Sequence, residues 1–289
     1  MWARRYGAIV ERFRAWAAED PAVRGALIVG SQARTQEPAD EWSDLDIVIF
    51  HTEPERLVAA TDWVGRFGEV AVTMVEETAV LGGRERRVFY ADGRDVDFAV
   101  FPAAALEFVP HVPEGQAILA RGFAVLIDKD GHLSAINGPP PRPARAEPPI
   151  PGEAEFRAVV SDFWYHVQWV AKKLRRGELW TAKMGSDAYL KQRLLRVIEW
   201  QTALRRPGAV DTWHDGRFLD RWAEADVRAR LPGTFARYER ADLARGLGET
   251  ERLFSDLARE IAERCHWQYP DFEETAVRAY VGRTLGDLR

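Results

Sequence analysis

The stretch from Gly30 to Asp46 carries residue types and a spacing that suit phosphate and metal chemistry. An apolar run at 26–29 ends in Gly30-Ser31, and twelve residues then separate Ser31 from Asp44. A Gly-Ser turn at the end of a strand offers free backbone N–H groups and a hydroxyl, which suit a phosphate. Asp44 and Asp46 are two positions apart, so in a strand their carboxylates point to the same face.

The two carboxylates of Asp44 and Asp46 would repel each other unless a cation lay between them. Hard oxygen ligands of this kind suit Mg²⁺. A phosphate-binding turn beside metal-binding carboxylates indicates phosphoryl or nucleotidyl transfer. The alternative is a surface loop followed by a strand that carries two solvated aspartates.

Periodic patterns around this stretch predict an α+β domain over residues 1–136. Apolar residues recur at helical spacing over 2–18, and Pro54 begins a second predicted helix at 54–63. Asp92-Gly93 is a pair suited to a tight hairpin turn. The predicted strands are 25–29, 45–50, 69–75, 87–90, 96–101 and 123–127. We therefore expect a mixed sheet with flanking helices.

The chain changes character after residue 136. Residues 137–152 contain seven prolines and predict a stiff, extended linker between two domains. Helical stripes then follow one another at 153–175, 180–205, 217–230, 234–246, 249–265 and 271–285. Because they show no repeat period, residues 153–289 are predicted to form an all-α helical bundle.

Charge is distributed unevenly between the two halves. Residues 1–136 hold 14 Lys+Arg and 22 Asp+Glu, a net charge of −8, whereas residues 137–289 hold 26 and 23, a net charge of +3. The acidic half favours a metal ion and a cationic acceptor over a nucleic-acid backbone. The mildly basic half suits a triphosphate.

Cysteine use and hydropathy bear on the location of the protein. One cysteine, Cys265, excludes an internal disulfide and a cysteine-based metal site, which is compatible with a reducing compartment. The sequence shows no secretory apolar segment and no run near the ~18 apolar residues of a membrane span. We expect a cytoplasmic protein with no membrane partner.

Three features occur together in this stretch: Gly30-Ser31, a twelve-residue spacer, and Asp44-Leu45-Asp46 at the start of an apolar strand. This set resembles the signature of the nucleotidyltransferase (polymerase β-like) superfamily. The resemblance implies that residues 1–136 are a nucleotidyltransferase catalytic domain.

Asp97 lies within the otherwise apolar predicted strand 96–101, where a carboxylate needs a partner. The superfamily has a third acidic residue on a later strand, and Asp97 matches that position. The resemblance therefore implies that Asp44, Asp46 and Asp97 are the catalytic and metal-binding residues. The alternative is that Asp97 is solvated on an edge strand beside Asp95.

The second half carries a series of aromatic and basic motifs. They are Phe163-Trp164-Tyr165, Val170-Ala171-Lys172, Leu179-Trp180-Thr181-Ala182-Lys183, Ile198-Glu199-Trp200, Trp267-Gln268-Tyr269-Pro270 and Val277-Arg278-Ala279-Tyr280. Together they resemble the helical half of the aminoglycoside 6-adenylyltransferases, also called streptomycin adenylyltransferases. The proline-rich linker and the abundance of Arg and Ala depart from this family, which puts the acceptor in doubt more than the chemistry.

This resemblance implies an enzyme that transfers AMP from Mg-ATP to a hydroxyl of a streptomycin-type aminoglycoside, releases pyrophosphate and confers antibiotic resistance. We expect two Mg²⁺ ions, ATP as co-substrate, a cationic small-molecule acceptor and a monomer. Nucleotide binding is expected at Gly30, Ser31, Arg34, Lys172 and Lys183. The helical domain at 153–289 would bind substrate and nucleotide. Alternatively, Lys172 and Lys183 are solvated helix lysines.

Several further side chains are candidates for ligand contact. Asp162, Asp187, Glu76 and Glu77 could bind an amino or guanidino group, and Trp164, Tyr165 and Trp180 could stack on a base or sugar. Three other functions stay open. They are transfer to another small-molecule or protein hydroxyl, a nucleic-acid-directed nucleotidyltransferase, and a non-catalytic nucleotide-binding module.

Overall fold

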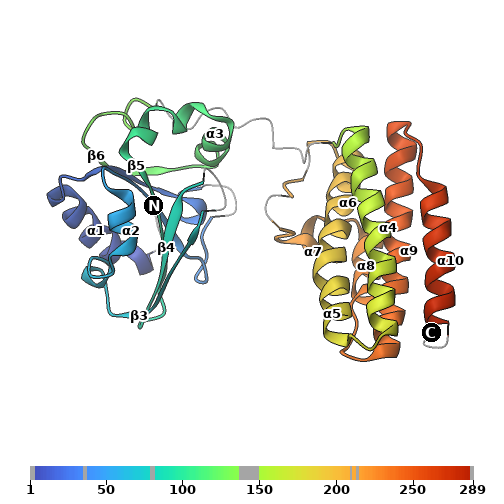
Figure 1. Ribbon diagram of the computed structural model, residues 1–289. Helices are drawn as coiled ribbons and strands as arrows, with labels where there is room; N and C mark the ends of the chain where they lie inside the picture. The colour runs from blue at the N-terminus through green and yellow to red at the C-terminus, as the bar shows by residue number, and fades with distance from the viewer. Residues whose placement is uncertain are drawn as a thin grey trace. The chain divides into compact units, whose positions relative to one another are not determined.

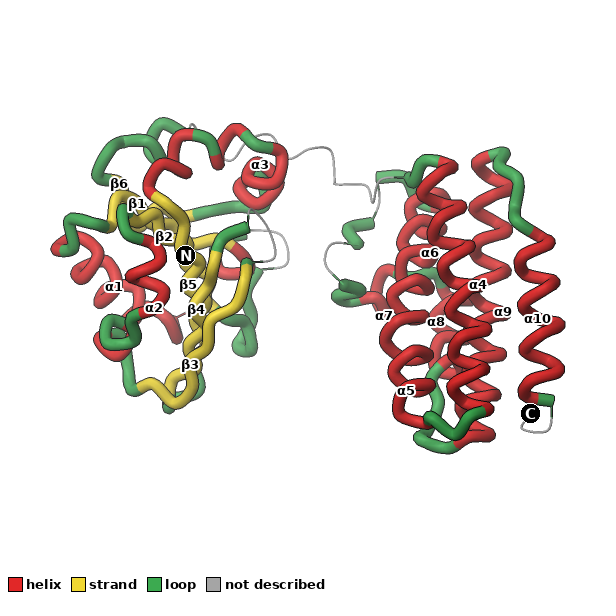
Figure 2. The backbone as a smooth tube through the Cα atoms, viewed as in Figure 1, coloured by secondary structure: helices red, strands yellow, loops and turns green. Residues whose placement is uncertain are grey.

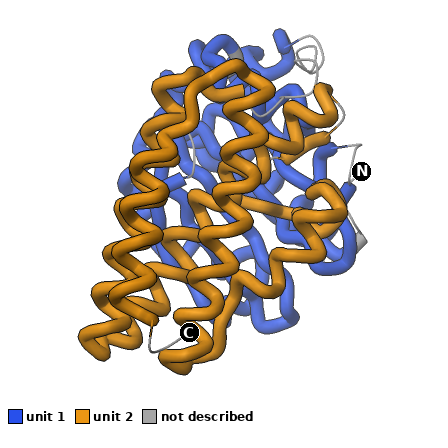
Figure 3. Tube along the Cα trace, turned by 90° about the vertical axis from the view of Figure 1, so that its right-hand side faces the viewer, with its two compact units in different colours: residues 1–143 blue, residues 144–289 orange. Residues whose placement is uncertain are grey.

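The computed structural model divides the chain into two compact units. They comprise residues 1–143 and 144–289, and Figure 3 gives each its own colour. The structure describes residues 4–34, 38–78, 82–136, 150–208, 210–212 and 215–286. All but the last three positions of the predicted linker at 137–152 lie outside the described residues.

A six-stranded sheet forms the centre of the first unit (Figures 1 and 2). Its strands are β1 (Val23–Val29), β2 (Leu45–His51), β3 (Val70–Glu77), β4 (Arg84–Tyr90), β5 (Asp95–Pro102) and β6 (Ala124–Asp128). The strand order is β3-β4-β5-β2-β1-β6. The pair β2–β5 is parallel and the other neighbouring pairs are antiparallel, so the predicted mixed sheet is confirmed.

The sheet has two apolar faces of unequal size. On one face, alternate residues of β2 (Leu45, Ile47 and Ile49) are fully buried with α1 (Gly7–Glu19) and α2 (Pro54–Ala59). The opposite face packs a smaller core against α3 (Pro113–Leu119). Because strand side chains alternate, the acidic residues of β2 and β5 lie on this second face.

Helices make up the second unit, as the sequence predicts (Figure 1). They are α4 (Glu153–Arg175), α5 (Leu179–Met184), α6 (Leu190–Arg205), α7 (Leu219–Trp222), α8 (Ala225–Thr234), α9 (Arg240–Cys265) and α10 (Asp271–Leu285). Phe163 of α4 and Phe254 of α9 stack in the core with ring centroids 3.6 Å apart. Among the described helices, none is long and apolar enough to cross a membrane.

Three predicted helix boundaries in this unit are wrong. The helix predicted at 217–230 is two short helices, α7 and α8, with Ala223 and Glu224 between them. The helices predicted at 234–246 and 249–265 are one continuous helix, α9, from residue 240 onward. Gly246 is tolerated within it because the helix packs tightly there: an added Cβ would lie 2.9 Å from the Cβ of Ala236. The helix predicted at 180–205 is interrupted by a π-helical turn, Gly185–Tyr189, between α5 and α6.

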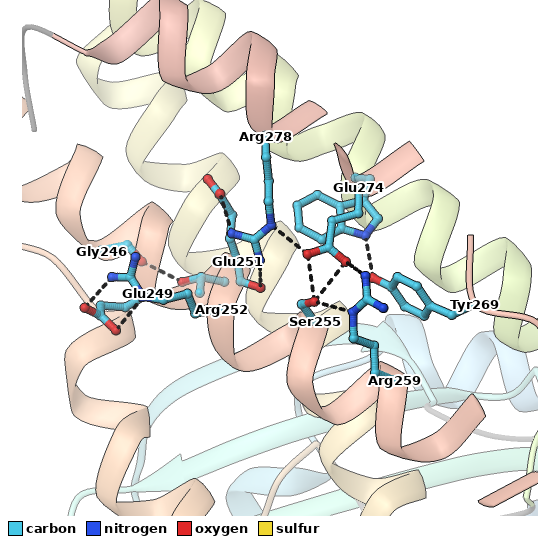
Figure 4. A network of polar contacts seen from close by, with 11 residues as sticks. Gly246, Glu249, Glu251, Arg252, Ser255, Arg259, Tyr269, Glu274 and Arg278 are labelled. Atoms are coloured by element: carbon cyan, nitrogen blue, oxygen red, sulfur yellow. Dashed lines mark hydrogen bonds and ion pairs between the residues drawn. The ribbon is translucent and has the colours of Figure 1, made fainter. Parts of the chain in front are cut away.

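A buried polar network joins α10 to α9 (Figure 4). The carboxylate of Glu274, which is 6% exposed, accepts hydrogen bonds from Ser255 at 2.8 Å, Arg259 at 2.9 Å and Arg278 at 2.6 Å. Burial would raise the pKa of Glu274, but these hydrogen bonds lower it below its usual range. The ionised carboxylate therefore stabilises the contact between the two helices.

We expect Glu274→Gln to lower the free energy of unfolding by about 2 kcal/mol at pH 7, because the buried donors lose a shared carboxylate. Since the pKa of Glu274 is lower in the folded than in the unfolded chain, its contribution is complete above about pH 5 and decreases as the pH falls below the ~4.3 of an unfolded glutamate. Urea titrations of the wild-type and variant proteins at pH 7 and pH 3 measure the difference.

Glu273→Gln, in the same turn of α10, is the matched control and should change the free energy of unfolding by less than about 0.5 kcal/mol. A destabilisation by Glu274→Gln that is the same at pH 7 and pH 3 would contradict the role of the ionised carboxylate.

Candidate active site

Three carboxylates converge on the second face of the sheet. Asp46 of β2 and Asp97 of β5 are direct partners in the parallel pair, and Asp44 immediately precedes β2. One carboxylate oxygen from each of the three residues lies within 4.8 Å of the other two, an arrangement that could hold a metal ion. The structure thus brings together the three residues that the sequence nominates. Asp97 is not solvated at an edge, because β5 lies between β4 and β2.

The environment of these carboxylates opposes their ionisation. Burial, with the nearby charges of Asp44 and Asp97, raises the pKa of Asp46 to about 8. Burial also raises the pKa of Asp97 to about 7, against the opposing effect of the Arg87 guanidinium. A divalent cation bound among the three would favour their charged forms. The donor set therefore fits Mg²⁺, for which carboxylate oxygens are suitable ligands.

Gly30 allows the end of β1 to lie directly against Asp46. Its backbone is left-handed, with φ of 67°, and an added Cβ would lie 1.9 Å from Oδ2 of Asp46. A side chain at this position would displace the carboxylate. The glycine is therefore required by both the turn and the close approach.

Ser31 and Gln32 follow in a 3₁₀ turn and are both buried. The hydroxyl of Ser31, a residue 5% exposed, has no hydrogen-bond partner among the described residues. Gln32 donates from Nε2 to the carbonyl of Asp44 at 3.0 Å and so fixes the start of β2 to the turn. A buried hydroxyl of this kind fits a ligand oxygen such as that of a phosphate.

Arg34 lies close enough to Asp46 for its charge to lower the pKa of that carboxyl. The structure thus places the charge of Arg34 near the acidic triad. Its predicted role in nucleotide binding stays a prediction.

Arg87 and Glu85 of β4 adjoin the triad, and neither is among the residues predicted from the sequence. The β4–β5 register places Arg87 opposite Asp97. Arg87 Nε lies 2.8 Å from Glu85 Oε1, 2.8 Å from Glu76 Oε1 and 3.3 Å from Asp97 Oδ2. The predicted partner of Glu76 was a group of a ligand, whereas the structure pairs its carboxylate with Arg87 of the same sheet. The sequence pattern that could have indicated them is the alternation of two charged residues, Glu85 and Arg87, along one strand.

The two predicted lysines lie in the helical unit. Lys183 donates to Asp187 and to the carbonyl of Ala236, and Lys172 is exposed with its Nζ 5.6 Å from the centroid of the Tyr280 ring. Asp187 is therefore engaged by Lys183. The role of both lysines in binding phosphate stays a prediction.

The other residues of the helical unit that were predicted to contact a ligand differ in the exposure of their side chains. Trp164 is 1% exposed and donates to Tyr269 at 3.0 Å, so its predicted stacking on a ligand is wrong and it belongs to the core. Tyr165 and Trp180 are exposed. Asp162 accepts a hydrogen bond from Tyr189 and forms an ion pair with Arg193.

Comparisons with known proteins found relatives along most of the chain. Two relatives are named aminoglycoside 6-adenylyltransferase. The Campylobacter jejuni protein is 22% identical over 90% of this chain and 88% of its own length. The Bacillus subtilis protein is 22% identical over 92% of this chain and 93% of its own length. A crystal structure of an aminoglycoside 6-adenyltransferase from Bacillus subtilis matches 95% of this chain and 96% of its own at 20% identity and a TM-score of 0.44.

The paired strands that carry the triad, the turn that abuts it and these relatives define an enzyme of the nucleotidyltransferase class. The model of the family described as streptomycin adenylyltransferase matches residues 3–284. Because that match spans nearly the whole sequence, the chain belongs to this family.

We expect the metal-free protein to lose stability as the pH rises from 5 to 8. The pKa of Asp46 is higher in the folded protein than the ~3.9 of an unfolded aspartate, so the folded state binds more protons across this window. Asp46→Asn should therefore raise the melting temperature at pH 8 in EDTA. Mg²⁺ should raise the melting temperature of the wild type more at pH 8 than at pH 5.

Asp62→Asn, which changes an exposed aspartate of the same unit, is the control and should follow the wild type. An Asp46→Asn protein that responds to Mg²⁺ as strongly as the wild type would refute the metal-binding role of Asp46.

Gly30→Ala should weaken Mg²⁺ binding at least about 10-fold, because the new Cβ displaces a carboxylate that the site requires. It also carries the backbone strain of a left-handed alanine, about 1–2 kcal/mol. Gly82→Ala is the matched control, since its φ is 61° and nothing lies within 4 Å of an added Cβ. Calorimetric titration with Mg²⁺ separates the two variants, and equal affinities would show that Gly30 serves the turn alone.

Proposed function

We propose that the protein is a Mg-ATP-dependent O-adenylyltransferase that transfers AMP to a hydroxyl of a streptomycin-type aminoglycoside and so confers resistance. The observation that carries the proposal is the convergence of Asp44, Asp46 and Asp97 beside the Gly30-Ser31 turn. Family membership and relatives named for aminoglycoside 6-adenylylation support it.

The residues of the first unit divide the chemistry among them. Asp44, Asp46 and Asp97 would hold two Mg²⁺ ions, which neutralise charge on the transferring phosphoryl group. The hydroxyl of Ser31 and the N–H groups around Gly30 would donate to the β- and γ-phosphates. Positioning and charge neutralisation then account for most of the catalysis.

Asp97 would accept the proton of the attacking hydroxyl. A carboxylate oxygen that is not bound to a metal ion can act as a general base when it lies within hydrogen-bond reach of the hydroxyl. As the acceptor oxygen bonds to the α-phosphorus, the bond from that phosphorus to pyrophosphate breaks. The proton passes to Asp97, and the products are the adenylylated acceptor and pyrophosphate.

The helical unit would bind substrate and nucleotide. Lys172 and Lys183 are its proposed phosphate contacts, each acting as a point charge. Lys183 would then exchange part of its present contact with Asp187 for a phosphate oxygen. Lys172 is exposed and would bind without that exchange.

Pyrophosphate release from Mg-ATP, measured across a panel of aminoglycosides, tests the proposal. We expect turnover with streptomycin, a loss of more than about 100-fold for Asp44→Asn, and a KM for ATP raised about 10-fold for Ser31→Ala. Turnover with none of the panel would refute the acceptor class while leaving the nucleotidyltransferase class standing. An active Asp44→Asn protein would reject the metal site.

A further inference from the structure

A cavity of about 160 Å³ adjoins the triad on the second face of the sheet. Three carboxylates, those of Asp46, Glu85 and Asp97, form part of its lining. Much of the remaining wall is apolar and comes from the strands and α3, including Val48, Ala99, Phe101 and Leu119. The cavity therefore combines a charged wall beside the reacting carboxylates with an apolar floor.

The volume of the cavity limits what it can hold. An apolar protein cavity of about 150 Å³ accepts one benzene molecule, so this space suits one six-membered ring. The two fused rings of a purine are larger than that. Glu85 is the cavity carboxylate that holds no metal ion in the proposed site, and its charge repels a phosphate from this part of the cavity.

Glu85 gives the cavity a preference for positive charge. Its side chain is 13% exposed and lies opposite Ala99 in the β4–β5 register. An ionised carboxylate offers about four lone-pair positions, so Glu85 can accept from Arg87 and from a ligand N–H at the same time. A buried carboxylate beside apolar side chains selects a cationic ligand group.

We propose that Glu85 and this cavity form the acceptor subsite, which receives one amino- or guanidino-bearing six-membered ring of the acceptor. The C–H face of the ring packs on Val48, Ala99 and Phe101, and its positive group binds Glu85. Its hydroxyl then lies beside Asp97. This inference rests on the proposed function, since that hydroxyl is the nucleophile of the adenylyl transfer.

Glu85→Gln tests the charge, with Glu76→Gln as a matched control. Both glutamates hold Arg87 Nε at 2.8 Å, but of the two only Glu85 lines the cavity among the described residues. Glu85→Gln should raise the KM for streptomycin at least about 10-fold and leave the KM for ATP unchanged. Glu76→Gln should change neither by more than about twofold. Calorimetric titration of streptomycin into protein with Mg²⁺ and a non-hydrolysable ATP analogue gives a readout independent of turnover.

Ala99→Leu tests the apolar floor, because the larger side chain fills the space of the ring. It should raise the KM for streptomycin at least about 10-fold, with the KM for ATP and the affinity for Mg²⁺ retained. Thermal melts of both variants verify that they fold.

Equal effects of Glu85→Gln and Glu76→Gln would overturn the subsite, since they would report a general loss of charge. A raised KM for ATP in either cavity variant would assign the cavity to the nucleotide and also overturn it. So would an unchanged KM for streptomycin in both cavity variants, with wild-type turnover intact. Failure of the proposed function is a separate result, in which the wild type turns over no aminoglycoside.

Discussion

The contact between the Asp46 carboxylate and the backbone of Gly30 is the constraint on which the first unit depends. It brings the end of β1 against β2 at the point where the parallel partner β5 supplies Asp97. The result is a set of carboxylates whose mutual repulsion and burial oppose ionisation. Such an arrangement costs stability, and it persists because the surrounding sheet fixes the positions of all three side chains.

The stability that offsets this cost comes from the other face of the sheet. Phe13, Trp16, Trp63, Phe67 and Phe98 form a continuous aromatic cluster there, with ring centroids 4.9 to 6.1 Å apart. The carboxylates and this aromatic cluster thus lie on opposite faces of one sheet. The helical unit is stabilised by a large apolar core and by the buried ionic contacts between α9 and α10.

Much of this site could be predicted from the sequence because strand alternation is a local property. Strand alternation predicted that Asp46 lies on the face opposite Leu45. The Asp92-Gly93 turn predicted the hairpin whose second strand contains Asp97. Glu85 and Arg87 were missed because the register between two strands decides which side chains meet, and that register depends on the whole sheet.

The helical half was less predictable for related reasons. Trp164 was predicted to contact a ligand because it belongs to an aromatic stripe at helical spacing. The same spacing is also typical of a helix face that packs into a core. The continuity of α9 through Gly246 follows from packing against Ala236, which local helix propensity cannot report. In the first unit, β3 is an edge strand paired with β4. A substitution on β3 therefore leaves the parallel pair β2–β5 in place, so this margin of the sheet can change without moving the strands that carry the metal-binding carboxylates.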